Sequence, residues 1–164
     1  RLMSVTAWIG LGSNLESPLQ QLHLALEALH QLPDTVLMDA SPIYRSSPVG
    51  PSDQPDFLNM VAKLATDLAA TTLLQQLLRI EDAQGRVRTQ TWGPRVLDLD
   101  LLLYGQETIA QPELSIPHPE IPNRDFVLRP LLDLDRDLAL PDGRRLEALL
   151  SECPDNGLTL VTLA

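Results

Sequence analysis

Residues 96–104 read Val-Leu-Asp-Leu-Asp-Leu-Leu-Leu-Tyr, and apolar and acidic residues alternate from Leu97 to Leu101. An alternation of period two is typical of a β-strand with one buried face. One face of this strand is predicted to carry the alternate leucines, namely Leu97, Leu99, Leu101 and Leu103. Asp98 and Asp100 fall on the opposite face, so two carboxylates are expected side by side and pointing the same way.

This pair of carboxylates is the feature of the sequence that is most informative about chemistry. Two such groups repel each other unless a cation or a shared proton compensates, and Mg²⁺ prefers oxygen ligands of this kind. The alternative is that Asp98 and Asp100 only form the solvent face of a half-buried strand. The apolar run Leu101–Leu103 favours a functional role, because it predicts a strand covered on both faces, and Asp is a poor strand former.

An arginine cluster precedes the strand, at Arg86, Arg88 and Arg95. The planar guanidinium group binds phosphate through a fork of parallel donors. A carboxylate pair next to an arginine cluster therefore predicts a site for a metal ion and a polyphosphate.

Composition limits the class of protein. The chain has 164 residues, of which 44% are hydrophobic, so we expect one domain over residues 1–164 with a substantial core. The formal net charge of −10 disfavours nucleic acid and anionic membranes as partners. The single cysteine, Cys153, allows no intramolecular disulfide, and we find neither a signal peptide nor an apolar run of about twenty residues. We therefore expect a cytoplasmic protein. Small molecules are expected as its partners, and we expect it to be a monomer.

The order of the predicted elements indicates the fold class. Strands are predicted at residues 4–11, 36–44, 57–66 and 96–104, and helices from 17 to near 33 and at 72–84. Ser17 is expected to cap the first helix, with Pro18 in its first turn. The order β-α-β-β-α-β predicts an α+β fold of the ferredoxin-like type, with both helices on one face of an antiparallel sheet. Helices near 127–134 and 146–152 and a short strand near 158–163 are expected as C-terminal additions.

Two long loops are expected, at residues 46–56 and 85–94, and long loops in a small domain are often functional. Glu81 continues the apolar stripe of the second helix, four residues after Leu77. Its carboxylate is therefore predicted to point inward, although a side chain near a helix end can also reach solvent.

Nucleotide-binding loops of two common kinds are missing from the sequence. It contains neither Gly-x-x-x-x-Gly-Lys-Ser/Thr nor Gly-x-Gly-x-x-Gly. A nucleotide would therefore have to bind on a different scaffold.

The motifs together resemble those of the 6-hydroxymethyl-7,8-dihydropterin pyrophosphokinase family. The matching segments recur in the family's order: Gly12–Leu15, Pro48–Pro51, Gln54–Asn59, Glu81 with Gly85–Arg88, Trp92–Asp100, Pro117-His118 and Asn123–Phe126. The segment Trp-Gly-Pro-Arg-x-Leu-Asp-Leu-Asp is highly specific. The resemblance implies a ferredoxin-like fold and the transfer of pyrophosphate from ATP to the hydroxymethyl oxygen of the pterin, which releases AMP in a step of folate biosynthesis.

The resemblance also implies roles for individual residues. Asp98 and Asp100 would hold two Mg²⁺ ions on the triphosphate, and Arg86 and Arg95 would stabilise the transferring group. The nucleotide would be surrounded by Glu81, Arg88, Trp92, Ser115, His118 and Arg124. The pterin would lie between Phe57 and Phe126, with hydrogen bonds from Asn59 and from the backbone around Ser46, Pro48 and Val49.

Four positions depart from common patterns of the family, namely Phe57, Leu78, Glu113 and Pro119. Two other classes remain as alternatives. A small-molecule sensor of this fold would bind nucleotide without turnover, and a metal-dependent phosphohydrolase would use the same acid pair with water as the nucleophile.

Overall fold

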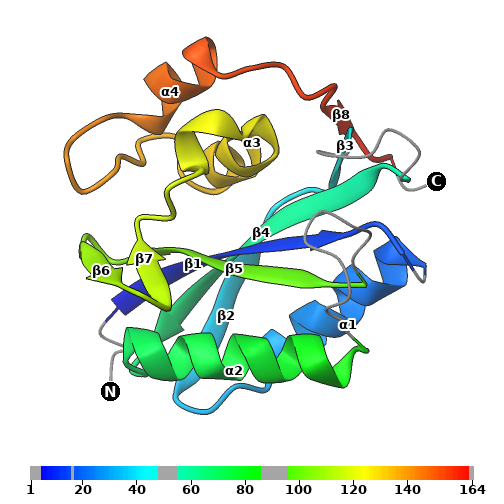
Figure 1. The fold of residues 1–164 in the computed structure, drawn as a ribbon, viewed down its shortest axis with the longest axis vertical. Helices are drawn as coiled ribbons and strands as arrows, with labels where there is room; N and C mark the ends of the chain where they lie inside the picture. The colour runs from blue at the N-terminus through cyan, green and yellow to red at the C-terminus, as the bar shows by residue number, and fades with distance from the viewer. Residues whose placement is uncertain (1–4, 16, 48–54, 86–95, 163–164) are drawn as a thin grey trace.

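A six-stranded antiparallel sheet forms the centre of the protein (Figure 1). The computed structural model describes residues 5–15, 17–47, 55–85 and 96–162. The strands follow the order β5-β1-β4-β3-β8, and β2 pairs with β4 beside β3. Their bounds are β1 Val5–Ser13, β2 Thr35–Ala40, β3 Tyr44–Ser46, β4 Phe57–Thr66, β5 Asp98–Tyr104 and β8 Thr159–Leu160.

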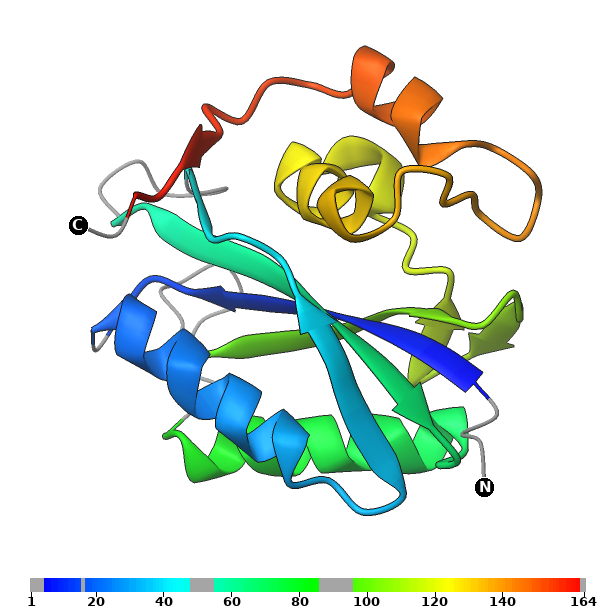
Figure 2. The same cartoon turned by 180° about the vertical axis from the view of Figure 1, so that it is seen from behind.

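Two helices cover one face of this sheet, α1 (Pro18–His30) and α2 (Ala70–Ala83) (Figures 1 and 2). They close a cluster of buried side chains that includes Ile9, Leu64 and Leu77. The observed order β1-α1-β2-β3-β4-α2-β5 confirms the predicted β-α-β-β-α-β order, with the second predicted strand divided into β2 and β3.

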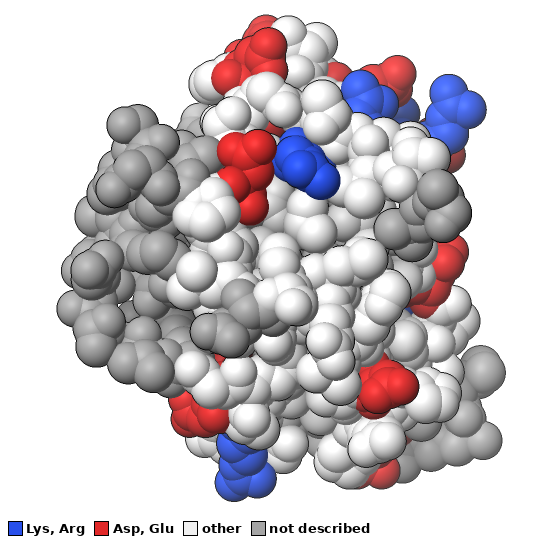
Figure 3. Space-filling view, turned by 90° about the vertical axis from the view of Figure 1, so that its right-hand side faces the viewer, with Lys and Arg blue, Asp and Glu red and all other residues white. Residues whose placement is uncertain are grey.

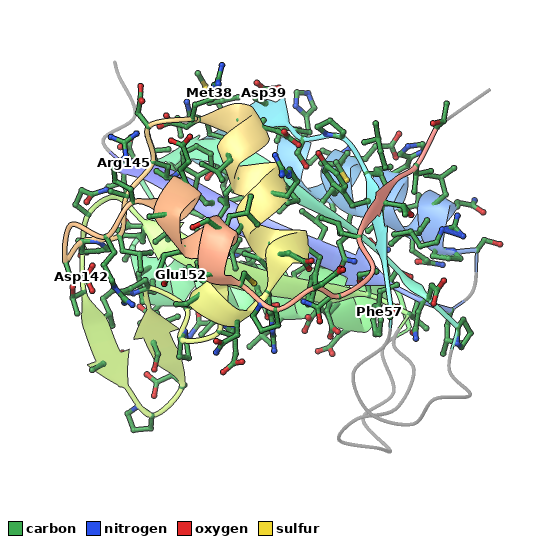
Figure 4. The ribbon with its side chains drawn as sticks, turned by 90° about the horizontal axis from the view of Figure 1, so that it is seen from above. Met38, Asp39, Phe57, Asp142, Arg145 and Glu152 are labelled. Atoms are coloured by element: carbon green, nitrogen blue, oxygen red, sulfur yellow. The ribbon has the colours of Figure 1, made fainter. Side chains whose placement is uncertain are left out.

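The other face of the sheet carries α3 (Asp125–Leu134), and α4 (Leu146–Glu152) packs on α3 (Figures 1 and 4). A second apolar cluster forms here around Trp8, Leu102 and Leu131. The predicted C-terminal helices are confirmed, α4 with the bounds expected and α3 starting two residues early.

A bulge in β5 corrects the predicted alternation of the leucines. Trp8 pairs with Leu103 and Ile9 pairs with Leu101, so the register shifts at Leu102. Leu103 consequently lies in the cluster under α3 and not in the cluster of Leu97, Leu99 and Leu101. The prediction for Leu103 was wrong because a bulge adds one residue to a strand. Side chains after the bulge therefore point to the opposite face of the sheet from the one that the alternation predicts.

The predicted strand 36–44 is two strands, separated at Ser41-Pro42-Ile43. Pro42 has no N–H group for the ladder. The Ser41 hydroxyl accepts a hydrogen bond from Val61 N at 2.9 Å and donates to the Pro42 carbonyl at 2.8 Å. This buried serine bonds to β4 where the pairing of β2 with β4 ends.

Ser17 precedes α1 but does not cap it with its side chain. Its φ of 59° places it in the left-handed region, and its side chain makes no capping hydrogen bond. Its carbonyl accepts the first helical hydrogen bond, from Gln21 N at 3.1 Å. The predicted boundary was therefore right, while the predicted mechanism of capping was wrong.

A second, two-stranded sheet was not predicted. It consists of β6 (Ile109–Gln111) and β7 (Leu114–Ile116), and a short 3₁₀ helix, η1 (Ile121–Asn123), follows it. The three-residue strands give too short an alternation to predict. No helix in the described part of the chain is long and apolar enough to span a membrane.

Candidate active site

Asp98 and Asp100 lie opposite two glycines of the neighbouring strand. In the pairing of β1 with β5, Asp98 faces Gly12 and Asp100 faces Gly10. Both carboxylate residues are half-buried. Since glycine has no side chain, β1 adds no side-chain atoms next to either carboxylate, and the nearest atoms over Gly12 and Gly10 belong to Asn59 and Leu102.

Asn59 continues the same row on the next strand, because Gly12 pairs with Asn59 of β4 as well as with Asp98. The Asn59 side chain is buried, and its Nδ2 donates to the Ser46 hydroxyl at 2.7 Å. A Cβ atom at position 12 would lie 3.2 Å from Asn59 Oδ1. Gly12 is therefore required for the present position of the Asn59 amide.

Ser13 and Asn14 hold the chain on either side of this row. The Ser13 hydroxyl donates to the Val96 carbonyl at 2.5 Å, just before β5 begins. Asn14 Nδ2 donates to the Pro55 carbonyl at 3.1 Å, just before β4 begins. Both side chains are buried. Sequence analysis assigned them no role, although they belong to the Gly-Ser-Asn motif.

Glu81 contacts the strand between the two aspartates. Its side chain is 2% exposed, which confirms that it points inward, and Oε2 accepts a hydrogen bond from Leu99 N at 2.8 Å. This bond fixes β5 relative to α2 at the residue between Asp98 and Asp100. Glu81 can therefore control the direction of both aspartates.

His118 lies along the edge of β5 that faces away from β1, where its backbone N–H donates to the Leu102 carbonyl at 2.9 Å. Its Nδ1 accepts a hydrogen bond from Glu120 N at 3.1 Å, so the neutral ring carries its proton on Nε2. Burial lowers the pKa of His118, and Arg124 lowers it further, against the opposing charges of Asp100 and Glu120. The lowered pKa favours the neutral imidazole, which offers a donor at Nε2.

A cavity of about 290 Å³ opens beside this edge of the sheet. Its wall includes Asp100 and His118 together with Leu74 of α2 and the turn between β6 and β7. The lining residues are Leu74, Leu99, Asp100, Leu101, Pro112, Glu113, Leu114, Ser115, His118 and Pro119. Of the predicted site residues, Asp100, Ser115 and His118 meet here. Glu113 and Pro119, two of the positions that differ from common patterns of the family, line the same cavity.

The two aromatic residues of the predicted pterin site come from different elements. Phe57 is half-buried at the start of β4, at one end of the sheet (Figure 4). Phe126 is partly buried near the start of α3, and the Arg124 guanidinium lies 5.8 Å from the centre of its ring. Ser46 pairs with Phe57 across β3 and β4. The structure thus brings Ser46, Phe57 and Asn59 together.

Six predicted site residues lie outside the described residues: Pro48, Val49, Arg86, Arg88, Trp92 and Arg95. On the face of the protein in Figure 3, the coloured Lys and Arg side chains are few, and red Asp or Glu side chains lie close to most of them. The described residues of that face form no broad basic surface.

A family model described as 7,8-dihydro-6-hydroxymethylpterin-pyrophosphokinase matches residues 8–136. The chain is 49% identical over 152 residues to a Haemophilus influenzae protein named 2-amino-4-hydroxy-6-hydroxymethyldihydropteridine pyrophosphokinase, covering 93% of this chain and 95% of the relative. A Pseudomonas aeruginosa protein of the same name is 52% identical over 151 residues, covering 92% and 93%.

Solved structures show the same fold. A crystal structure of HPPK-DHPS in complex with substrates superposes with a TM-score of 0.73 at 12% identity over 90% of this chain. The wild-type HPPK-DHPS of Plasmodium falciparum superposes with a TM-score of 0.71 at 14% identity over 93%. This chain spans less than half the length of those two chains, 43% and 45%. The likeness confirms the ferredoxin-like α+β fold. By the family model and by its identity to these relatives, the chain belongs to the 7,8-dihydro-6-hydroxymethylpterin-pyrophosphokinase family.

Proposed function

We propose that the row formed by Asp98, Gly12 and Asn59, with Asp100 beside it, is the active site of the family's reaction in this protein. That reaction transfers pyrophosphate from ATP to the hydroxymethyl oxygen of 6-hydroxymethyl-7,8-dihydropterin and yields the pterin diphosphate and AMP, a step of folate biosynthesis. The observation that carries the proposal is the strand register, which places the acid pair and the buried Asn59 amide on either side of a glycine.

Mg²⁺ fits the donors on β5. The two half-buried aspartates present oxygen ligands opposite glycines. No group of three or more His, Cys, Asp or Glu side chains that could hold a metal occurs among the described residues, so these residues offer two carboxylates and not a complete set of protein ligands. Mg²⁺ is commonly bound by one or two carboxylates, with phosphate and water oxygens as the other ligands. Two bound Mg²⁺ ions would neutralise triphosphate charge as the anhydride bond breaks. Asp98 and Asp100 would hold them.

Glu81 is proposed as a positioning residue for these ligands. Its hydrogen bond to Leu99 N fixes the backbone between Asp98 and Asp100, and catalysis of phosphoryl-type transfer depends mainly on alignment and on charge neutralisation. Arg86 and Arg95 are proposed to bind the phosphates, from outside the described residues.

The cavity beside β5 is proposed as the site of the nucleoside part of ATP. Leu74, Leu99 and Leu101 give it apolar walls for a base, and Ser115 lines it as a polar group. His118 adds a neutral side chain with a donor at Nε2. Arg88 and Trp92, from outside the described residues, and Arg124 are proposed to complete the nucleotide site.

The pterin is proposed to bind at the end of the sheet near Phe57. A flat heterocycle gains from contact with aromatic faces, which Phe57 and Phe126 would provide. The Asn59 amide offers both a donor and an acceptor to the polar edge of the ring. Its Nδ2 is oriented by Ser46, and backbone groups near Ser46, Pro48 and Val49 are proposed to bind the same edge.

We further propose that residues 1–164 form one domain and that the enzyme works as a cytoplasmic monomer. The continuous sheet that joins β1 to β8 supports a single domain, because it includes strands from both ends of the described chain.

A product assay tests the function. Purified protein is incubated with Mg·ATP and 6-hydroxymethyl-7,8-dihydropterin, and the nucleotides are separated chromatographically. We expect AMP to form in step with the pterin diphosphate and only when the pterin is present. ADP or free phosphate would instead indicate a kinase or a phosphohydrolase. Nucleotide binding without turnover would support the sensor.

A further inference from the structure

The segment after α4 joins two parts of the protein that flank the proposed pterin site. In Figures 1 and 2 it leaves α4 and reaches β8 beside β3. Strand β8 pairs with β3, where Tyr44 faces Leu160 and Arg45 faces Thr159. Val161 N donates to the Ile43 carbonyl at 2.9 Å, which extends this attachment.

Asn156 makes hydrogen bonds to both parts. Its backbone N donates to Asp125 Oδ2 at 3.0 Å, and its Nδ2 donates to Asp125 Oδ1 at 2.9 Å. Its carbonyl accepts a hydrogen bond from Ser47 N at 3.0 Å. One residue thus connects the start of α3 with the end of β3.

The two residues held by Asn156 are direct neighbours of proposed pterin contacts. Asp125 precedes Phe126, and Ser47 follows Ser46, the side chain that orients Asn59. Asp125 is 8% exposed, so its carboxylate is largely removed from water and depends on these hydrogen bonds. A shift of Asn156 would therefore move Phe126 relative to Ser46.

Gly157 shows how closely the segment lies against β3. Its φ of 67° is in the left-handed region, and a Cβ atom there would lie 2.9 Å from Ser47 Oγ. A second connection between β3 and α3, the hydrogen bond from the Tyr44 hydroxyl to Asp133, does not involve Asn156. Loss of the Asn156 contacts should therefore shift Phe126 relative to Ser46 and Asn59, while the Tyr44–Asp133 bond keeps α3 attached to β3.

We propose that Asn156 and Asp125 are positioning residues that fix the distance between Phe126 and the Ser46–Asn59 wall, and that they thereby set the affinity for the pterin but not for ATP. The proposal rests on the pterin site proposed above.

Two single variants break the contact in different ways. In Asp125→Asn, the new amide nitrogen faces the amide nitrogen of Asn156, so two donors oppose each other. In Asn156→Asp, two carboxylates oppose each other. The double variant Asp125→Asn/Asn156→Asp restores both bonds between these two residues, because the amide at position 125 accepts from the backbone N–H and donates to the carboxylate at position 156. Like Asn156→Asp, it still lacks the bond from Asn156 Nδ2 to the Pro154 carbonyl, which is 3.2 Å long in the parent. Asp155→Asn is the matched control, since the Asp155 carboxylate accepts a hydrogen bond from Gly157 N in the same turn, at 2.8 Å, and an amide oxygen can accept the same bond.

The KM for the pterin, the kcat, and the Kd of a non-hydrolysable ATP analogue with Mg²⁺ are measured for each variant. We expect each single variant to raise the pterin KM about tenfold, since small displacements of substrate contacts have effects of this size or larger. The Kd of the ATP analogue should stay within about twofold of the parent value, and the double variant should recover the pterin KM to within about threefold.

Several outcomes would overturn the proposal. These are an unchanged pterin KM in the single variants, a parallel rise in the Kd of the ATP analogue, a similar rise in the control, or no recovery in the double variant. A parent protein that forms no AMP from ATP and pterin would instead overturn the proposed function, so the two failures are distinguishable.

Discussion

The face of the sheet that carries α3 has two ends with opposite character. At one end, Trp8, Val61 and Leu103 are buried in the cluster under α3. At the other, Asp98, Gly12 and Asn59 lie on the same three strands, β1, β4 and β5. The same strands thus build a hydrophobic core at one end and present polar groups and glycines at the other. Stability is expected to depend on the first end and chemistry on the second.

The largest effect should come from the polar end. Asp98→Ala is expected to lower kcat by about a thousandfold or more, because it removes a proposed ligand of the metal ions that neutralise the triphosphate. The rate of AMP formation at saturating substrates measures this effect. Asp142→Ala removes an exposed carboxylate near α4 and should leave kcat unchanged (Figure 4).

The fold of the Asp98→Ala variant separates the two interpretations of the acid pair. A half-buried carboxylate that serves as a metal ligand can be removed without loss of core packing. Thermal unfolding followed by circular dichroism should therefore give a melting temperature close to that of the parent. A large drop in melting temperature would indicate that Asp98 is structural.

Substitutions at the apolar end should lower the stability of the protein and leave its activity largely unchanged. Leu131 of α3 is fully buried, and Leu131→Ala is expected to lower the free energy of unfolding by about 2–5 kcal/mol. Denaturant titration measures this change. The kcat at a temperature where the variant is folded should stay within about twofold of the parent value, since no proposed contact is lost. A loss of activity comparable to that of Asp98→Ala would contradict the assignment of stability to the apolar end and of chemistry to the polar end.

Gly12→Ala tests the glycine between the acid pair and Asn59. A Cβ atom there approaches Asn59 Oδ1 to 3.2 Å, so the amide must move, and we expect the KM for the pterin to rise about tenfold. Gly10→Ala is the matched control, because its Cβ would be 3.4 Å from a methyl group of Leu102, which can adjust. Equal effects of the two substitutions on the pterin KM would remove the special role of position 12.

The smallest effect concerns the Tyr44 hydroxyl, which connects β3 to α3. Burial and the hydrogen bond to Asp133 raise the pKa of Tyr44 from 10.0 to about 12. A pKa that is higher in the folded than in the unfolded state adds stability at pH values below 10, and this contribution is lost as the pH rises toward 12.

The parent should therefore lose stability between pH 10 and 12 more steeply than Tyr44→Phe, as measured by denaturant titration across this range. Some loss should remain in the variant, because burial also raises the pKa of Tyr104. If the free energy of unfolding falls with pH equally steeply in the parent and in Tyr44→Phe, the raised pKa of Tyr44 is contradicted.

The sequence predicted the elements whose signals are local. The strand at 57–66 and the helix at 146–152 have the predicted bounds. The bulge at Leu102 could not be predicted, since it depends on the pairing of β5 with β1. The left-handed conformation of Ser17 was not predicted either. Residues 17–20 match a capping pattern, but the Ser17 side chain makes no capping hydrogen bond.

The candidate site was predictable in part. The period-two pattern placed Asp98 and Asp100 together, and the helical spacing placed Glu81 inward, where it meets Leu99 N. The contact of Asn156 with Asp125 spans 31 residues and has no local signature. It follows only from the folded arrangement of α3 and the C-terminal segment.

The central claim is that the polar end of the sheet binds ATP through metal ions on Asp98 and Asp100. Calorimetric titration with a non-hydrolysable ATP analogue, with and without Mg²⁺, tests it most directly in the parent and in Asp98→Asn/Asp100→Asn. We predict that Mg²⁺ strengthens binding of the analogue to the parent and has little effect on binding to the double variant. Equal strengthening in both proteins would contradict the claim.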